Sequence, residues 1–317
     1  MSTVGHAGAK AIVLGEHAVV YGMPAIAVGI DRGARAVATA LTYGPSRLCV
    51  GSWGLAVTDG GEHDLARAYA ALLDATRATH RALGAFDVEV DVSVPPGAGL
   101  GCSAAVGVAV ARAVDPRASD VAIQERVMAW ERVFHGNPSG IDAAVAARGG
   151  CYLYRKGAGL ELLHIRAPLV FCIGNTGAAS STKAMVESVA RLRARRPKLV
   201  DESLQAIRTL VQNARLALEA GDRTALGRLM DLNQMLLSGL FVSTSEIERM
   251  CGLARDHGAH GAKLTGAGGG GSVLALAPSA DVGEAILSAW RTAGFDGFST
   301  RVAAESPEPS LERDSAP

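Results

Sequence analysis

A glycine-rich loop between an expected strand and an expected helix is the feature that most constrains this chain. Residues 86–94 (FDVEVDVSV) alternate apolar and polar side chains, which predicts a strand with one buried face. Residues 95–101 (PPGAGLG) follow without a break, and residues 103–113 are small, apolar and compatible with a helix. Glycine lets the backbone approach a ligand closely, and the N-terminus of a helix favours negative charge. The segment therefore predicts an anion-binding site, with an ordinary glycine turn as the competing interpretation.

The spacing of this loop excludes two common kinds of nucleotide site. No lysine followed by serine or threonine comes after the loop, so the Walker pattern is absent. The glycines at positions 97, 99 and 101 give G-x-G-x-G, which is not the spacing of a dinucleotide fingerprint. A phosphate bound here would be held by a different arrangement.

Three further motifs carry groups suited to catalysis. Gly15–Gly22 (GEHAVVYG), with Lys10 before it, gathers lysine, glutamate and histidine near one turn. Glu131–Asp142 (ERVFHGNPSGID) places one carboxylate at the end of a helix and another about one turn inside the next, so both can face one cleft. Lys263–Gly271 (KLTGAGGGG) lies between apolar runs, which favours close backbone approach to a ligand over a flexible linker. Each motif alone has a plain structural interpretation, such as a solvated surface charge.

Composition limits the remaining classes of function. The chain has 317 residues, which suits one large domain or two packed lobes, and its 31 basic and 31 acidic residues balance. This balance gives no support for a nucleic-acid partner or an anionic membrane surface. Five scattered cysteines without C-x-x-C spacing argue against a zinc site or a disulfide framework. With no signal peptide or long apolar run in view, a cytoplasmic protein is expected.

Periodicity predicts the other elements. We expect a short strand over Ala25–Ile30 and a helix over 64–83. Further expected helices span 121–134 and the segment from Pro138 to 147, and expected strands span 150–154, 169–174 and 272–277. Residues 182–257 are expected to be mostly helical, with breaks near Pro197, Gly221 and Ser243. The expected organisation is an N-terminal lobe over 1–165, a C-terminal lobe over 166–304 and a disordered tail over 305–317.

The four motifs together resemble the GHMP kinases. Lys10 with GEHAVVYG, PPGAGLGCSAA, HGNPSGID and KLTGAGGGG occur in the order and approximate spacing of that family, over roughly residues 8–300. GEHAVVYGMPA and HGNPSGID resemble its mevalonate kinase branch. The resemblance implies a two-lobed α+β GHMP kinase fold, with a ribosomal-protein-like N-terminal lobe, a ferredoxin-like α/β C-terminal lobe and the active site between them.

The resemblance also implies roles for single residues. Asp142 and Lys10 would be catalytic, and Ser103 and Glu131 would bind Mg²⁺; Glu131 stands eleven positions before Asp142, as in the family. The residues implied to bind ATP are Pro95, Gly97, Ala98, Gly99, Leu100, Gly101, Cys102, Ser103 and Ala104. Those implied to contact the acceptor are Glu16, His17, Asp142, Thr182 and Gly268.

The implied reaction transfers the ATP γ-phosphate to the 5-hydroxyl of mevalonate in isoprenoid biosynthesis, and a homodimer is compatible with it. Two positions depart from the family pattern. Cys102 stands where the family usually has a serine, and Ser180 stands where many mevalonate kinases carry arginine. Lys183 is one candidate replacement for that arginine, and no replacement at all is the other. A related acceptor, such as phosphomevalonate or another mevalonate hydroxyl, is therefore an alternative. A non-catalytic ligand sensor is a second one, although Lys10, Ser103, Glu131 and Asp142 are all retained.

Overall fold

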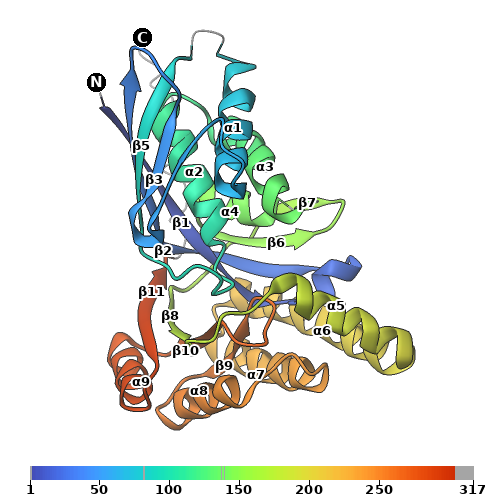
Figure 1. The fold of residues 1–317 in the computed structure, drawn as a ribbon. Coiled ribbons are helices and arrows are strands. Elements are labelled where there is room, and N and C mark those ends of the chain that lie inside the picture. The colour runs from blue at the N-terminus through green and yellow to red at the C-terminus, as the bar shows by residue number, and fades with distance from the viewer. Residues whose placement is uncertain (1, 81–82, 137, 139, 304–317) are drawn as a thin grey trace, which may run out of the picture.

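The computed structural model describes residues 2–80, 83–136, 138 and 140–303, arranged as an upper and a lower lobe in Figure 1. A seven-stranded sheet forms the upper lobe, in the order β4-β3-β5-β2-β6-β7 with β1 paired to β2. Its strands are β1 (Ser2–Leu14), β2 (Ala25–Leu41), β3 (Arg47–Val50), β4 (Leu55–Thr58), β5 (Ala85–Val92), β6 (Cys151–Arg155) and β7 (Gly159–Leu162). Two short 3₁₀ helices, η1 (Ala18–Tyr21) and η2 (Gly51–Trp53), lie in its connections.

Strand β2 is the central strand of this sheet and pairs with three other strands. Its first residues pair with β6, its last eight pair with β5, and β1 runs antiparallel along the other edge. The prediction that this strand ends at Ile30 was wrong, because β2 continues for 17 residues. Gly33 explains the continuation: a side chain there would place Cβ 2.1 Å from the Ala7 carbonyl oxygen, so only glycine lets the two strands stay paired past the register shift at Gly8.

Four helices pack on the upper sheet (Figure 1). They are α1 (Asp64–Arg77), α2 (Cys102–Val114), α3 (Asp120–His135) and α4 (Ile141–Arg148). The strand-loop-helix prediction is confirmed: β5 leads into the glycine loop, and α2 lies against β1, β2 and β5 with nearly every residue buried. Two helix boundaries were wrong. Helix α1 ends at Arg77, before Leu83, and α4 begins at Ile141, after the left-handed Gly140, and not near Pro138.

The lower lobe is a four-stranded antiparallel sheet, in the order β11-β8-β10-β9, with helices packed against it. Its elements are α5 (Thr182–Arg195), α6 (Pro197–Ala220), α7 (Arg223–Gly239), α8 (Ser245–Asp256), α9 (Ala280–Thr292), β8 (Leu169–Asn175), β9 (Gly261–Thr265), β10 (Ser272–Ala277) and β11 (Asp296–Val302). The expected helix breaks are confirmed. Gly221 ends α6 in a left-handed conformation, and the Thr244 hydroxyl caps α8 by accepting from the Ile247 N–H.

Both lobes share one continuous core. A single cluster of buried hydrophobic side chains extends from Ala7 in β1 to Val302 in β11. At the junction the Thr300 hydroxyl donates to the Asp31 carboxylate at 2.6 Å. We keep 165/166 as the proposed boundary, since it falls between β7 and β8, while the tail over 305–317 lies outside the described residues. Within the described part of the chain, no helix is both long and apolar enough to span a bilayer.

Candidate active site

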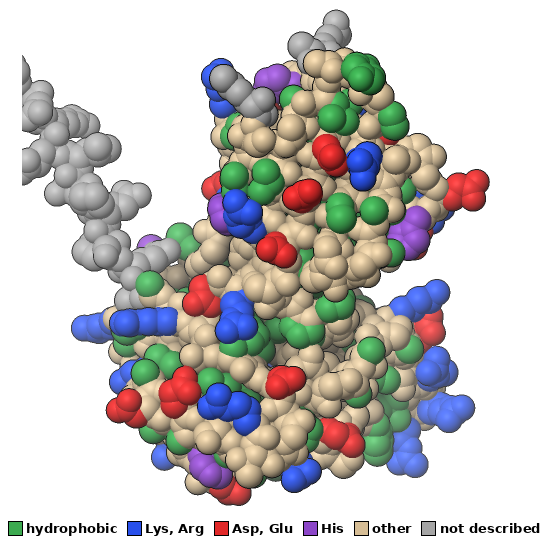
Figure 2. Space-filling model, turned by 60° about the vertical axis from the view of Figure 1, so that its left-hand side comes forward, with side chains coloured by type: hydrophobic (Ala, Val, Ile, Leu, Met, Phe, Trp, Pro, Cys, Tyr) green, Lys and Arg blue, Asp and Glu red, His purple; other side chains and the backbone are tan. Residues whose placement is uncertain are grey.

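A cavity of about 630 Å³, which we call the interlobe cleft, brings all four sequence motifs together. The upper lobe lines it with the glycine loop, the start of α2, and residues of β1, α3 and α4. The lower lobe contributes the start of α5 and the loop after β9. In Figure 2 the two lobes are distinct masses joined at a narrower waist, and neither sign of charge dominates the visible face. The charge of the cleft is therefore set by the residues that line it.

The glycine loop presents backbone N–H groups to the cleft. Gly97, Gly99 and Gly101 have φ values of +72°, +78° and +69°, which glycine adopts at little cost. Helix α2 starts directly after Gly101 with no side chain capping its first turn, so the N–H groups there are free to meet an anion. A side chain at Gly101 would place Cβ 3.0 Å from Lys10 Cγ, which shows how closely the loop and the lysine pack.

Lys10 and Asp142 form an ion pair beside this loop. The Lys10 Nζ lies 3.3 Å from Asp142 Oδ1 and donates to the Gly99 carbonyl oxygen at 3.3 Å. The Lys10 side chain is 7% exposed and that of Asp142 is 31% exposed. The lysine is thus held in place by two partners, while the aspartate keeps a face open to a ligand.

Ser103 and Glu131 form a second polar pair. The Ser103 hydroxyl donates to Glu131 Oε1 at 2.7 Å and accepts from the Trp130 Nε1–H at 3.1 Å. Burial raises the pKa of Glu131 to about 7, although the Ser103 hydrogen bond opposes the shift. His135 Nε2 lies 3.6 Å from Glu131 Oε2. A buried carboxylate beside a hydroxyl is a set of hard oxygen donors that is stabilised by a cation, so these residues fit Mg²⁺.

The turn carrying Glu16 and His17 reaches across to the lower lobe. His17 adopts φ +59°, unusual for a residue other than glycine, and its Nε2 lies 2.8 Å from the Ala267 carbonyl oxygen. Burial lowers the pKa of this imidazole. The Glu16 carboxylate is fully buried in an ion pair with Lys263 and accepts from Asn233 Nδ2 at 3.1 Å. Glu16 lines the cleft next to His17, and its contact with the acceptor stays a proposal.

Sequence reasoning missed Lys263 and Asn233 as functional neighbours of this turn. Lys263 opens the KLTGAGGGG motif, so its position was a usable signal. Asn233 lies within the regular helix α7 and carries no local signal, because its only distinctive feature is its distant partner Glu16.

The other predicted site residues divide into two groups. Gly97, Gly99 to Ala104 and Thr182 line the cleft, whereas Pro95, Ala98 and Gly268 do not. The Gly268 carbonyl accepts from the Ser180 hydroxyl, so it fixes a residue that does line the cleft. The Cys102 thiol donates to the Val94 carbonyl oxygen at 3.8 Å, and burial raises its pKa to about 12. Its side chain thus stays a neutral thiol directed at the backbone, which leaves only its N–H for a phosphate.

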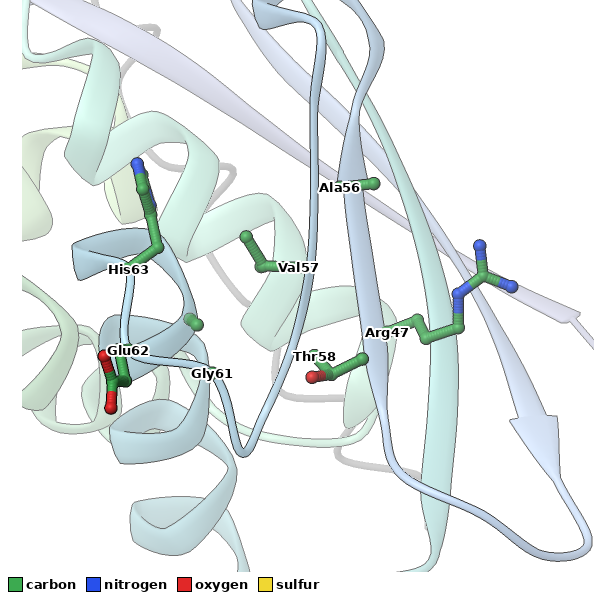
Figure 3. Close-up of a pocket in the computed structure, with 8 residues that line it drawn as sticks. Arg47, Ala56, Val57, Thr58, Gly61, Glu62 and His63 are labelled. Atoms are coloured by element: carbon green, nitrogen blue, oxygen red, sulfur yellow. The ribbon is translucent and has the colours of Figure 1, made fainter.

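A smaller hollow of about 340 Å³ lies on the upper lobe between β4 and the start of α1 (Figure 3). Its charged side chains diverge: Arg47 and Glu62 point in different directions, and His63 caps α1 by accepting from the Leu65 N–H. With no polar groups converging on a ligand position, it is a weaker candidate than the interlobe cleft.

Known families match both lobes of the chain. The family model for the GHMP kinases N terminal domain matches residues 65–150, and that for GHMP kinases C terminal matches residues 214–296. Mevalonate kinase of Pyrococcus abyssi is 36% identical, over 94% of this chain and 95% of the relative. The chain belongs to the GHMP kinase family.

A second relative and a solved structure are both mevalonate kinases. Mevalonate kinase of Pyrococcus horikoshii is 37% identical to this GHMP kinase, over 94% of this chain and 95% of the relative. The crystal structure of L. major mevalonate kinase in complex with R-mevalonate matches with a TM-score of 0.82 and 27% identity, covering 97% of both chains. The expectation of a two-lobed GHMP kinase fold is confirmed.

Proposed function

We propose that this GHMP kinase is a mevalonate kinase, which transfers the γ-phosphate of ATP to the 5-hydroxyl of mevalonate in isoprenoid biosynthesis. The Lys10–Asp142 pair beside the glycine loop is the observation that carries the proposal. Phosphoryl transfer needs an acceptor oxygen aligned with the γ-phosphate and positive charge near it. A partly exposed carboxylate held next to a buried ammonium supplies both, between the glycine loop and the His17 turn.

Each proposed catalytic group has a physical role. Asp142 accepts the hydrogen of the acceptor hydroxyl, which orients the oxygen toward phosphorus and gives its proton a destination. Lys10 pairs with Asp142 and stabilises the negative charge that develops at the acceptor oxygen. The free N–H groups of the loop and of the first turn of α2 bind the triphosphate.

Ser103 and Glu131 would hold Mg²⁺, which would supply charge neutralisation of the phosphate oxygens. Across the described residues, no group of three or more His, Cys, Asp and Glu side chains converges on one point. A metal here would thus share one hydroxyl and one carboxylate with phosphate and water, as Mg²⁺ often does. Burial raises the pKa of Glu131 to about 7, so a cation bound beside it would favour the ionised carboxylate.

The acceptor is assigned from the relatives and from the His17 turn. Curated relatives at 34% to 37% identity are named mevalonate kinase, and His17 is fixed against Ala267 at the edge of the cleft. Ser180, where the family resemblance implies arginine, favours keeping a related acceptor as a second candidate. Streptococcus pneumoniae phosphomevalonate kinase shares the fold, with a TM-score of 0.77 at 19% identity.

A coupled ADP-release assay with mevalonate, phosphomevalonate and homoserine as acceptors tests the assignment. We expect turnover with mevalonate to exceed turnover with the others by orders of magnitude. Turnover with phosphomevalonate alone would replace the first candidate with the second, and no turnover with any acceptor would favour a ligand sensor.

The proposal also places the enzyme in the cytoplasm and allows a homodimer. Sedimentation at several protein concentrations would detect such a dimer.

Replacing the proposed base tests the mechanism. Asp142→Asn keeps the shape of the side chain but removes its charge, so kcat should fall roughly 10²- to 10⁴-fold while ATP affinity changes little. Asp256→Asn, at the exposed end of α8, is the matched control and should keep full activity. Turnover of Asp142→Asn near that of the parent enzyme would exclude the assigned role.

A further inference from the structure

The basic side chains of the interlobe cleft nearly all contact protein partners. Among the described residues that line it, the basic side chains are Lys10, His17, His135 and Lys183. Lys10 is paired with Asp142, His17 Nε2 lies at the Ala267 carbonyl, and His135 lies beside Glu131. Lys183 is left: it makes no hydrogen bond or ion pair with the described part of the chain and is exposed. One ammonium group in the cleft is therefore free to bind a ligand.

Lys183 enters the interlobe cleft from the lower lobe, whereas the glycine loop and the start of α2 belong to the upper lobe. It is the second residue of α5, and Val186, one turn later, lines the same cavity. The last turn of α5 lies beside η1, because the Arg193 guanidinium stacks over the Tyr21 ring at 4.8 Å. Val19 and Val20 of η1, which directly follows His17, line the same cavity as Lys183 and Val186. The triphosphate, in contrast, is expected at the start of α2.

Ser180 cannot supply the missing positive charge. The Ser180 side chain is uncharged, and its hydroxyl donates a hydrogen bond to the Gly268 carbonyl oxygen, also in the lower lobe. An acceptor with a carboxylate would bring a negative charge into a cleft that already holds Glu131 and Asp142. Two like charges in a partly buried site repel each other unless a cation lies close by.

We propose that the Lys183 ammonium binds the carboxylate of the acceptor and so selects for anionic acceptors, while Val186 contacts the acceptor's apolar chain. This inference rests on the proposed function, because it assumes that mevalonate, a hydroxy acid, is the acceptor. Lys183 is a specificity-determining residue and is not needed for the phosphoryl transfer step itself.

Steady-state kinetics of Lys183→Met and Lys183→Arg test the inference. A hydrogen bond between charged groups contributes enough that its loss should raise the KM for mevalonate about 10- to 100-fold. In Lys183→Met we expect kcat and the KM for ATP to stay within about threefold of the parent values, because the transferring groups are untouched. Lys183→Arg should restore most of the affinity for mevalonate. Lys156→Met, in the exposed turn after β6, is the control for loss of one positive charge.

The methyl ester of mevalonate, which lacks the negative charge, makes the test specific. The parent enzyme and Lys183→Met should have similar KM values for this ester. A mevalonate KM for Lys183→Met equal to that of the parent would overturn the inference, as would a rise confined to the KM for ATP, which would place Lys183 at the triphosphate. Failure of the parent enzyme to use mevalonate would instead overturn the proposed function, so the two failures can be told apart.

Discussion

At the scale of single residues, burial in the cleft sets the protonation of side chains, and Glu131 shows the effect clearly. An exposed glutamate titrates near 4.5, but desolvation raises the pKa of Glu131 to about 7 in the folded chain. The side chain is only 3% exposed and is held by the Ser103 hydroxyl. Because Glu131 is proposed to bind Mg²⁺, a carboxylate that is half protonated near neutral pH would make the metal affinity sensitive to pH.

This shift predicts a pH-dependent stability of the metal-free protein. Between about pH 4.5 and pH 7 the folded state keeps a proton on Glu131 that the unfolded chain releases, so the contribution of Glu131 to stability falls as pH rises. The loss approaches about 3 kcal/mol across that window. Glu131→Gln, which mimics the protonated form, should not show it.

Urea unfolding at pH 5 and pH 7.5 in the presence of a chelator measures the effect. The free energy of unfolding of the parent protein, relative to Glu131→Gln, should decrease between the two pH values. A difference between the two proteins that is the same at both pH values would show that the carboxylate is not buried as the structure has it.

At the scale of elements, the two glycine loops and the Glu16 turn connect the upper and lower lobes. Gly99 of the glycine loop before α2 packs against the backbone at Gly266, and Glu16 pairs with Lys263 of β9. Burial raises the pKa of Glu16 and lowers that of Lys263, and their mutual attraction opposes both shifts. The strained His17 is therefore fixed from both sides, by a buried ion pair and by the Ala267 carbonyl.

Removing one member of the buried pair should be costly. Lys263→Met leaves the Glu16 carboxylate buried without its cation, and we expect a loss of about 3–5 kcal/mol in unfolding free energy. The double variant Glu16→Gln with Lys263→Met should regain part of that loss, because no unpaired charge remains. Urea unfolding of both variants measures the difference, and a double variant no more stable than Lys263→Met would contradict this account.

The contact between the loops predicts different costs for two neighbouring glycines. Gly97→Ala should cost about 1–2 kcal/mol from its positive φ alone, because its Cβ would meet no atom within 4 Å. Gly99→Ala has a similar φ, but its Cβ would lie 3.1 Å from the Thr265 carbonyl oxygen and 3.3 Å from Gly266 Cα. We expect about 1–3 kcal/mol of additional destabilisation. Equal unfolding free energies for the two variants would mean that the loops do not pack this closely.

At the scale of the whole molecule, the lobes share buried surface, and we expect them to unfold together. The hydrophobic cluster that joins β1 to β11 crosses the proposed boundary, and β1 lies against β9 as well as β2. Calorimetry should therefore show one transition with matching calorimetric and van't Hoff enthalpies. Two separate transitions would show that the boundary at 165/166 divides independent folding units. Saturating Mg²⁺ and ATP should raise the temperature of this single transition, because a ligand that binds only the folded state adds to the free energy of unfolding. The added free energy is about 2.7 kcal/mol at a hundredfold excess of ligand over Kd.

The sequence by itself determined the local elements and the chemistry that they carry. Alternation in residues 86–94, the loop after them and the small residues of α2 predicted the strand, the anion site and the helix, because each depends on neighbours a few positions away. The helix breaks at Pro197 and Gly221 followed from the same kind of local signal.

Only the tertiary structure decided how these pieces meet. The continuation of β2 past Ile30 depends on the close approach of Gly33 to β1. Glu16 finds its partner Lys263 far along the chain, and Glu131 acquires its altered pKa from the surrounding core. Such pairing and desolvation are properties of groups distant in sequence and close in space, so no local pattern encodes them.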